Sequence, residues 1–255
     1  MVRGFYQVGS GIMTQSKVID TIANNLANAN TSGYKKQNTV TTSFENMLVS
    51  MVGTDRYGSN VSNPLYDKSY LDIVSDTVTS FVQGAVEPSE RNLDFCIQGK
   101  GFFRIRTNSG EDCYTRSGSF DLDEEGYLYL SGAGRVQDAN GRDIYLGTDN
   151  IICGSNGELY NKDTGAYYGR IGLFDFDDYA GLVEFKDTMF KASANPFAAT
   201  DAVLENQKLE ASNIDMAQEI TSAMRAQNTL QSQANILQMY ADILDDGTKR
   251  ISQIK

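Results

Sequence analysis

The chain has 255 residues, 40% hydrophobic and 22% charged, so it is long enough to bury at least one core. Its formal net charge of −11 opposes binding to nucleic acid or to an anionic membrane surface, and neither partner is expected. The chain contains no histidine, which removes the commonest general base, the imidazole metal ligand and any serine or cysteine nucleophile activated by histidine.

The N-terminal residues resemble neither a secretory signal nor a membrane span, because polar residues interrupt every apolar run. We therefore expect no cleavable signal peptide and no direct membrane insertion. If the protein leaves the cytosol, it uses an uncleaved signal of another kind.

Apolar residues recur every seven positions near the N-terminus. One column of this heptad pattern contains Phe5, Ile12, Ile19 and Leu26. A second contains Val8, Ile22 and Ala29, with the polar Gln15 among them. The pattern predicts a helix of about 26 residues, roughly 39 Å long. The polar run that begins at Asn28 is expected to end the helix, with Gly33 at a positive φ.

Residues 36–70 are polar and rich in Ser, Thr and Asn, which is typical of a connector whose order depends on its neighbours. We expect this connector to be partly extended. Its apolar patch is compatible with a short helix and contains Phe44, Met47, Leu48, Met51 and Val52.

The middle of the chain has the composition of β-strands. Runs at 93–98, 101–106, 126–130, 143–146 and 169–176 are rich in aromatic and β-branched residues. Turn signals containing Asn, Asp and Gly separate them at 108–110, 138–141 and 154–157. An antiparallel sheet or small barrel over 71–205 is predicted.

The heptad pattern returns at the C-terminus. Its first column contains Met216, Ala223, Leu230, Leu237, Leu244 and Ile251, and its second contains Ile220, Gln227, Ala234 and Ala241. Ser212 and Asp215 have the spacing of a capping box at the helix start, and Gly247 weakens the last turns. A single amphipathic helix more often packs on its own core, but two heptad helices at opposite ends favour helix pairing.

Possible chemical motifs are better explained by structural roles. Residues 121–126 start like a calcium loop, but Gly132 occupies the position of the required glutamate. Residues 99–104 lack the third glycine of a dinucleotide loop and are expected to enter a strand. The carboxylates of 175–178 are expected in a solvated turn. Cys96, Cys113 and Cys153 lack metal-site or redox spacing and are expected to be small buried residues.

Residues 23–36 closely resemble the N-terminal signature of flagellar basal-body rod and hook proteins, NNLANxxTxGYK. The matching residues are Asn24, Asn25, Leu26, Ala27, Asn28, Thr31, Gly33, Tyr34 and Lys35. Segments 94–103 and 114–128 are similar to the β-domain motifs of this family, and 209–215 is similar to its approach to the last helix. Residues 226–232 depart from the family, which often has an arginine–aromatic pair there.

The residues and the resemblance together predict an α+β fold. Long N- and C-terminal helices are expected to pair as a coiled-coil layer, with a central, mainly antiparallel β-domain. The expected domains are an N-terminal helix of the coiled-coil layer at 1–35, the connector at 36–70, the β-domain at 71–205 and a C-terminal helix of the same layer at 206–255. The expected assembly interface contains Phe5, Val8, Ile12, Ile19, Ile22, Leu26, Ile220, Leu230, Leu237 and Leu244.

The resemblance implies a structural subunit of the flagellar rod that polymerises through its terminal helices into a tube, transmits torque and carries the export channel. It implies self-assembly, contacts with other rod and hook proteins, and delivery by the flagellar export apparatus to the basal body. No enzyme activity, cofactor or metal is expected. The alternatives are a hook-type axial protein, for which the chain is short, a secreted β-domain binding module on a helical stalk, and a hydrolase that uses the carboxylates of 175–178.

Overall fold

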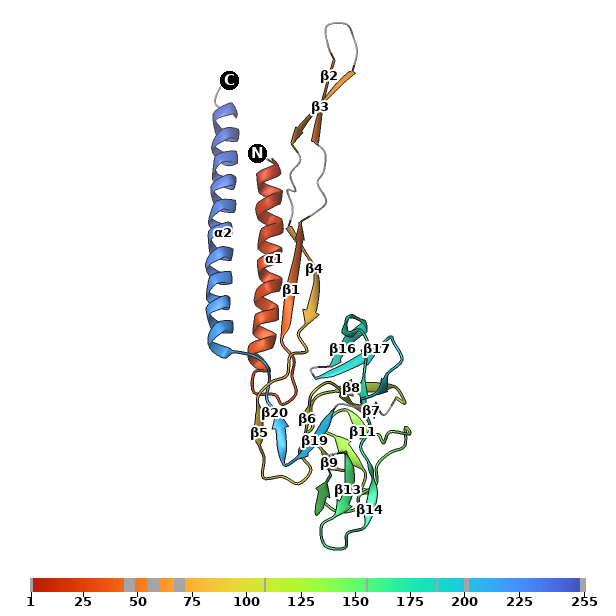
Figure 1. Cartoon of the computed structure of the whole chain (residues 1–255). Helices are drawn as coiled ribbons and strands as arrows, with labels where there is room; N and C mark the ends of the chain where they lie inside the picture. The colour runs from red at the N-terminus through yellow and green to blue at the C-terminus, as the bar shows by residue number, and fades with distance from the viewer. Residues whose placement is uncertain are drawn as a thin grey trace. The chain divides into compact units, whose positions relative to one another are not determined.

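The computed structural model describes residues 2–43, 49–54, 60–66, 72–107, 109–154, 156–186, 188–199 and 202–252 (Figure 1). The chain forms two compact units. The first, which we call the helical unit, consists of Met1–Leu26, Gln37–Val78 and Met216–Lys255; the second, the β unit, consists of Ala27–Lys36 and Thr79–Asp215. The chain therefore passes between the units four times.

These boundaries differ from the sequence-based domains at three places. Residues 72–78, which were predicted to belong to the β-domain, lie in the helical unit. Residues 27–36 and 206–215 belong to the β unit, whereas the sequence analysis placed them largely with the terminal helices. The reason is that these two segments bond to each other and to the rest of the β unit. Gly33 N donates to Glu210 O at 2.8 Å, and Ala211 N donates to Ala85 O at 2.8 Å.

The helical unit contains both long helices, α1 (Val2–Ala27) and α2 (Met216–Ser252). The predicted bounds of α1 are confirmed, because its 26 residues end just before the polar run at Asn28. The C-terminal heptad pattern is helical from Met216 onward, and α2 continues through Gly247 to Ser252 although the glycine was expected to weaken the last turns. The predicted capping box is wrong: α2 begins at Met216, and Ser212 lies before it with a buried Oγ that has no hydrogen-bond partner.

The helical unit also contains extended segments. Its strands are β1 (Gln37–Ser43), β2 (Val49–Thr54), β3 (Asn60–Tyr66) and β4 (Asp72–Thr79), which continues one residue into the β unit. Strand β1 pairs with β4, and β2 pairs antiparallel with β3. The short helix expected here is wrong for Met51 and Val52, which lie in β2. Phe44, Met47 and Leu48 lie outside the described residues.

The β unit contains the remaining strands and a short 3₁₀ helix. They are β5 (Val86–Pro88), β6 (Phe95–Gln98), β7 (Phe102–Thr107), β8 (Asp112–Thr115), β9 (Asp121–Leu122), β10 (Leu128–Leu130), β11 (Gly134–Val136), β12 (Ile151–Cys153), β13 (Glu158–Asn161), β14 (Tyr167–Arg170), β15 (Leu173–Asp175), η1 (Tyr179–Gly181), β16 (Leu182–Lys186), β17 (Met189–Ala192), β18 (Phe197–Ala198), β19 (Val203–Asn206) and β20 (Lys208–Glu210).

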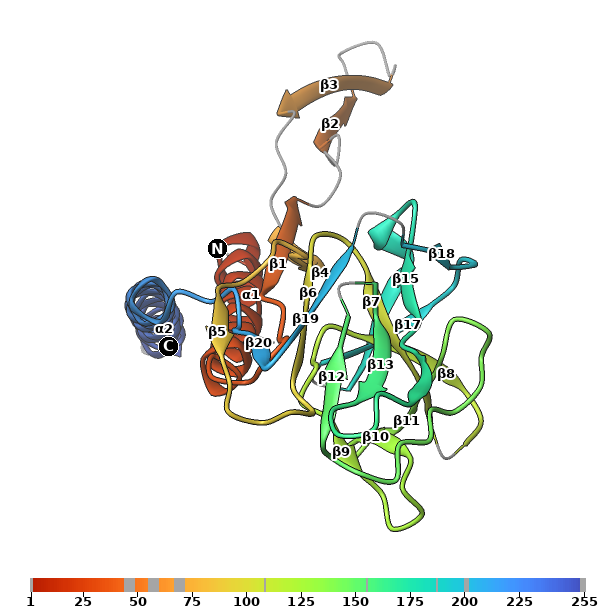
Figure 2. The same cartoon turned by 60° about the horizontal axis from the view of Figure 1, so that its bottom comes forward.

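The main sheet of the β unit has the order β16-β17-β8-β7-β11-β10-β9, with β15 pairing β7 and β18 pairing β15. Smaller sheets are β12-β13-β14, β19-β6 and β20-β5 (Figure 2). Every pair in these sheets is antiparallel, as predicted. The run 143–146 is an exception among the expected strands, because it makes only isolated bridges at Asp143 and Tyr145.

Three of the predicted turns contain a glycine with positive φ. Gly110, Gly141 and Gly157 have φ of 83°, 82° and 83°, a conformation that side chains with a Cβ rarely adopt. Each follows the Asn, Asp or Ser residues that marked the turn in the sequence. These turns set the register of the short strands that they join.

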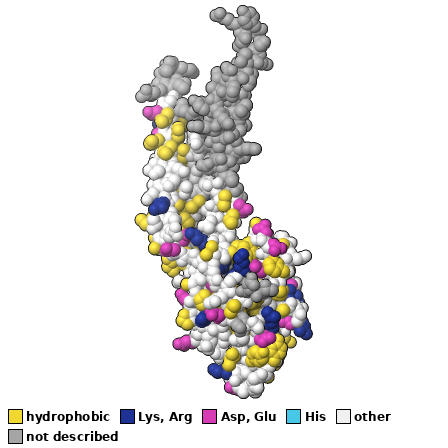
Figure 3. All heavy atoms as spheres, in the orientation of Figure 1, with side chains coloured by type: hydrophobic (Ala, Val, Ile, Leu, Met, Phe, Trp, Pro, Cys, Tyr) yellow, Lys and Arg dark blue, Asp and Glu magenta, His cyan; other side chains and the backbone are white. Residues whose placement is uncertain are grey.

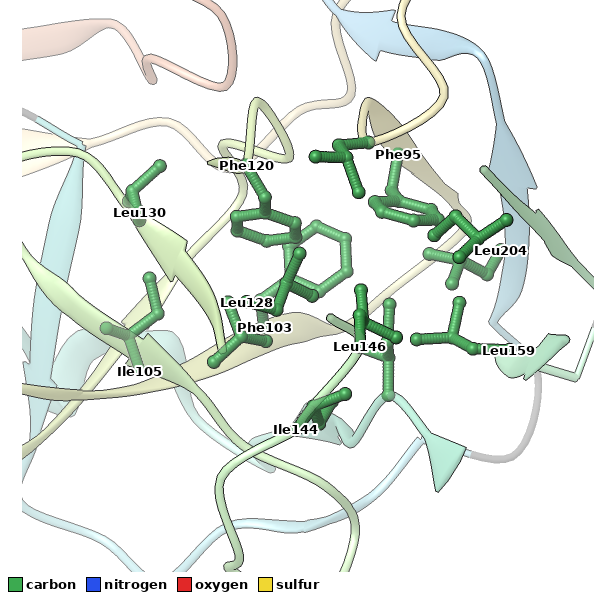
Figure 4. Close-up of a cluster of buried hydrophobic side chains, with 14 of the residues drawn as sticks. Phe95, Phe103, Ile105, Phe120, Leu128, Leu130, Ile144, Leu146, Leu159 and Leu204 are labelled. Atoms are coloured by element: carbon green, nitrogen blue, oxygen red, sulfur yellow. The ribbon is translucent and has the colours of Figure 1, made fainter. Parts of the chain in front are cut away.

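The core of the β unit lies between its sheets. Phe103 and Phe120 are fully buried with ring centroids 5.1 Å apart, in the edge-to-face geometry that aromatic pairs prefer. Figure 4 shows these rings packed with Phe95, Leu128 and Leu146. Because inward-facing residues alternate along β7, Phe103 and Ile105 both point into this core.

Candidate functional site

The two long helices contact one another along a single line. A Cβ added to Gly4 would lie 2.6 Å from the Tyr240 hydroxyl, and one added to Gly11 would lie 2.7 Å from Gln233 Nε2. Nearer the other end of α1, Asn25 Nδ2 donates to Glu219 Oε2 at 3.4 Å. The structure therefore places α1 and α2 side by side and antiparallel (Figure 1).

These contacts follow a constant register. From Gly4 to Gly11 the chain advances seven residues while the partner goes back seven, from Tyr240 to Gln233. From Gly11 to Asn25 it advances fourteen while the partner goes back fourteen, to Glu219. Heptad spacing is thus present on both helices, but the contact line lies one residue before the predicted Phe5 column.

The sequence missed this line because its side chains are small or polar. Two glycines on α1 allow close approach, and on α2 the facing residues are Glu219, Gln233 and Tyr240, with the buried Ala226 in the same column. The signal that points to them is the spacing of Gly4, Gly11 and Asn25, which matches that of the apolar columns. The apolar columns themselves flank the line.

The predicted assembly residues fall into three classes of exposure. Phe5, Leu26, Ile220 and Leu244 are exposed, between 37% and 47%. Val8, Ile12, Ile19, Leu230 and Leu237 are half-buried, and Ile22 is buried. The structure brings these residues onto the two neighbouring helices, but within the described residues it encloses only Ile22 of the set.

Further exposed apolar residues lie outside the predicted columns. They are Tyr6 and Met13 on α1, and Met224, Ile236, Met239 and Ile243 on α2. Met13 is 75% exposed and Tyr6 66%, which are high values for large apolar side chains. Figure 3 shows hydrophobic side chains gathered on the described part of α2 toward its C-terminal end. An extended apolar surface of this kind is typical of protein–protein contact.

Asn25, a residue of the family signature, links three elements of the helical unit. Asn25 is 1% exposed, its Nδ2 donates to Gln37 O at 2.8 Å and its Oδ1 accepts from Gln37 N at 3.0 Å. Asn25 therefore satisfies both polar backbone groups of the first residue of β1. Because it also bonds to Glu219, one buried amide fixes the ends of α1, α2 and β1.

Another part of the signature forms a buried ionic cluster in the β unit, which we call the Lys35 cluster (Lys35, Glu210 and Arg116). Lys35 Nζ lies 2.5 Å from Glu210 Oε1 and donates to Val82 O at 2.9 Å. Arg116 Nη1 lies 3.3 Å from Glu210 Oε2. Burial lowers the pKa of Lys35, against the opposing effect of the Glu210 charge.

Gly33 has the predicted positive φ of 72°, but it does not end α1, which stops at Ala27. A Cβ at this position would lie 2.3 Å from Ser117 N, so the glycine is required for close backbone packing as well as for φ. The neighbouring signature residue Tyr34 is fully buried. Thr31 Oγ1 donates to Asn28 Oδ1 at 3.2 Å in the turn between them.

Signature residues on the surface complete this segment. Asn24 and Ala27 are exposed on the last turn of α1. The signature residues therefore fix the path of the chain where it leaves α1. None of its residues forms a catalytic arrangement in the part of the chain that is described.

The motifs considered for chemistry have structural roles. Asp175 is 9% exposed and accepts from Phe176 N and the Tyr179 hydroxyl, while Asp178 caps η1. This corrects the expectation that 175–178 is wholly solvated. Cys96 and Cys113 are buried and Cys153 is half-buried, and burial raises the pKa of Cys96 to about 11 and that of Cys153 to about 12. The described residues contain no cluster of acidic or cysteine side chains able to hold a metal ion.

A chain whose signature residues serve packing, and whose helices carry exposed apolar columns, has the character of a structural assembly protein. Two family models match it: "Flagella basal body rod protein" over residues 5–35, and "Flagellar hook protein FlgE/F/G D1 domain" over residues 96–163. The first match includes most of α1 and the signature, and the second lies within the β unit.

Relatives match over nearly the whole chain. The flagellar basal-body rod protein FlgG of Bacillus subtilis is 30% identical, covering 96% of this chain and 98% of the relative. The rod protein FlgF of Caulobacter vibrioides is also 30% identical, covering 95% of each. FlgG of Borreliella burgdorferi is 26% identical over 96% of this chain and 97% of its own length. The chain belongs to the flagellar basal-body rod protein family, which confirms the resemblance and places it in the basal body of the bacterial flagellum.

The family is one of structural proteins rather than known enzymes. In the described part of the chain no helix combines the length and apolar character needed to span a membrane.

Proposed function

We propose that this rod subunit polymerises through α1 and α2 into a tubular axial structure that transmits torque and encloses an export channel. Its partners are further copies of itself and other rod and hook proteins. The flagellar export apparatus delivers it to the growing end. These partners follow from the family and from the apolar surface of the helical unit.

The observation that carries this proposal is the shortage of enclosed apolar side chains in the helical unit. Among the side chains described there, only Ile22 and Ala226 are buried apolar residues. Phe5, Ile220 and Leu244 remain exposed to water in the single chain. Because fully burying one such side chain is worth about 1.5–3 kcal/mol, contacts with neighbouring copies supply a large driving force.

The geometry of such contacts favours an open polymer. The apolar columns lie on more than one side of the helical pair, so one copy can contact different neighbours through different faces. Heterologous contacts that do not close into a ring generate a helical filament. A tube follows when these contacts repeat laterally as well as along the axis.

The test is a charge placed in the predicted column, at Leu237. Leu237→Asp puts an ionised side chain into a half-buried position on α2, which would destabilise the assembled helix interface by about 3 kcal/mol. We expect concentrated protein to form no rods by electron microscopy and cells to lose swimming. The near-ultraviolet circular dichroism of the β unit should be retained.

The matched control is Asn228→Asp, on an exposed position of the same helix, where a charge changes stability by about 0.5 kcal/mol or less. This variant should form rods and support swimming. If both variants swim, α2 is not an assembly element and the proposal fails. If only the Asn228 variant is immotile, the assembly face has been assigned to the wrong side of α2.

A further inference from the structure

We infer that the side chain of Asn213 joins three connections of the chain where they leave the β unit, so that a load on one connection is shared by all three. We call the residues concerned the Asn213 joint (Lys36, Ser80, Val82 and Asn213). The sharing of load rests on the proposed function, because load reaches the joint only in a subunit that is part of a rod. The hydrogen bonds of the joint are already present in the single chain.

The joint lies next to three of the four places where the chain passes between the units. Lys36 is the last β-unit residue before β1. Ser80 follows Thr79, the residue at which β4 ends and the β unit resumes. Asn213 lies shortly before Met216, where α2 begins. The connections to β1, β4 and α2 therefore all leave the β unit close to this one side chain.

A single amide links the three connections. Asn213 Oδ1 accepts from Lys36 N at 2.7 Å, and Asn213 Nδ2 donates to Ser80 O at 2.9 Å and to Val82 O at 3.0 Å. A backbone N–H can only donate and a backbone carbonyl can only accept, so these partners fix the orientation of the amide. Asparagine suits the position because its short side chain carries both an acceptor and two donor hydrogens.

The amide bonds to backbone groups that lie beyond the ends of the β1–β4 pair. Strand β1 starts at Gln37 and β4 ends at Thr79, so Lys36 and Ser80 are the next residues on either strand. Ser80 N donates to Lys36 O at 2.8 Å, and residues 80–85 have no regular secondary structure. Because backbone polar groups outside a strand ladder need other partners, the Asn213 amide continues the pairing where the ladder stops.

Asn213 projects from a segment that is fixed to the β unit. Glu210 Oε1 accepts from Gly84 N at 2.9 Å, and Ala211 N donates to Ala85 O at 2.8 Å. A Cβ built on Gly84 would lie 1.9 Å from Ala211 O, so the two segments pack backbone against backbone. The buried ionic cluster described above shares the Glu210 carboxylate with this contact. The amide is therefore a fixed point to which the other two connections are bonded.

Load sharing follows from hydrogen bonds that act side by side. A connection without lateral bonds yields by rotation about its own φ and ψ, the soft dihedrals of the backbone. Connections bonded to one side chain yield only when several hydrogen bonds open together, and such an opening is rarer than the opening of one bond. The Asn213 joint therefore limits local opening at Lys36 and at 80–85, while the core around Phe103 is independent of it.

The first experiment measures hydrogen–deuterium exchange by mass spectrometry on the unassembled full-length chain. Asn213→Asp keeps the size of the side chain and one acceptor, but it replaces the two donor hydrogens with an oxygen that faces Ser80 O and Val82 O. The matched control is Asn206→Asp in β19. It removes an amide donor to the backbone oxygen of Asn92, a bond of 2.6 Å within the β unit that involves none of the three connections.

We expect peptides that contain Lys36 or residues 80–85 to exchange at least tenfold faster in Asn213→Asp than in the unmodified chain or in Asn206→Asp. Exchange in β7, which lies in the core, should be unchanged. Equal exchange at the joint in both variants would overturn the inference. An equal rise in β7 would also overturn it, because Asn213 would then stabilise the whole unit. If Asn213→Asp does not fold, Asn213→Ala removes the same bonds without adding a charge and is judged by the same criteria.

The second experiment tests the sharing of load in cells that swim in plain and in viscous medium. We expect Asn213→Asp to form rods and to swim normally in plain medium, but at least twofold more slowly than Asn206→Asp in viscous medium, where each flagellum carries a higher load. Equal speeds would contradict load sharing, and so would a loss of rods confined to Asn213→Asp, since the joint would then serve assembly. If the unmodified chain forms no rods, the proposed function fails and load sharing with it, whereas exchange in the single chain still decides whether the joint exists.

Discussion

The β unit and the helical unit differ in how completely they bury their apolar side chains. In the β unit, Phe95, Phe103, Ile105 and Leu128 have no exposed surface. In the helical unit, Phe5 and Ile243 are 41% and 56% exposed although they lie in heptad helices. The comparison teaches that one unit completes its core within the chain, while the other leaves apolar side chains of its helices exposed in the single chain.

Buried polar groups show the same contrast. The Lys35 cluster has charged side chains with almost no exposure, each in contact with an opposite charge. On the contact line of the helices, Gln233 has a buried Oε1 without a hydrogen-bond partner. A satisfied ionic cluster fixes one arrangement, whereas an unsatisfied amide leaves the helical contact easier to change.

The largest effect that sharpens this comparison is expected at Glu210. Glu210→Gln removes the carboxylate that faces both Lys35 and Arg116, leaving two buried cations without their counterion. Breaking a buried ion pair in this way costs about 3–5 kcal/mol. Urea unfolding followed by near-ultraviolet circular dichroism measures the loss.

The control for this change is Glu205→Gln, in the same unit. Glu205 pairs with Lys208, whose side chain is 42% exposed, and such pairs contribute about 1 kcal/mol or less. If Glu210→Gln is no more destabilising than Glu205→Gln, the Lys35 cluster is not what holds segments 27–36 and 206–215 on the β unit.

An intermediate effect is expected at Gly33. Gly33→Ala suffers from the positive φ of 72° and from a Cβ that would lie 2.3 Å from Ser117 N. Gly132→Ala has nearly the same φ, 73°, but its Cβ meets nothing within 4 Å. We expect a cost of about 1–2 kcal/mol for Gly132→Ala and at least about 1 kcal/mol more for Gly33→Ala.

The difference in stability loss between the two variants separates the cost of the contact with Ser117 from the cost of the positive φ. Thermal unfolding of both variants, scored on the same β-unit signal, provides the measurement. Equal losses would mean that the Ser117 backbone can move aside, and that only φ demands glycine at position 33.

Features set by local sequence were predictable. The bounds of α1 follow from the heptad pattern and the polar run at Asn28, and the turns at Gly141 and Gly157 follow from Asn-Gly pairs. The signature could be recognised, but not the role of Lys35. Glu210, which pairs with both Lys35 and Arg116, is far from them in the sequence, and no local sequence pattern predicts such a contact.

The register of the helices was the main feature that the sequence could not give. Apolar columns at Phe5 and Leu230 predict a contact face on each helix, but hydrophobicity does not distinguish contacts within a chain from contacts between chains. The contact line uses Gly4 and Gly11, whose lack of side chains carries no hydrophobic signal. A fragment of 71–205, the sequence-based β-domain, would also lack both Lys35 and Glu210.

The smallest effect is expected at Gly11, where the helical unit should tolerate what the β unit does not. Gly11→Ala places a Cβ 2.7 Å from Gln233 Nε2, which is the far end of a flexible side chain rather than backbone. Gln233 can turn away, and its Oε1 gives up no hydrogen bond by doing so. Alanine also gains about 0.5–1 kcal/mol over glycine in a helix interior. We therefore expect a change in stability between about zero and 1 kcal/mol in favour of the variant, measured by far-ultraviolet circular dichroism of the unassembled chain.

Gly9→Ala is the matched control, because Gly9 lies on the same helix and its Cβ meets nothing within 4 Å. The gain of Gly9→Ala minus that of Gly11→Ala then gives the cost of moving Gln233. If Gly11→Ala destabilises the helices by more than about 1 kcal/mol while Gly9→Ala stabilises them, the contact line is as rigid as the β-unit packing, and the contrast between the two units does not extend to their glycine contacts.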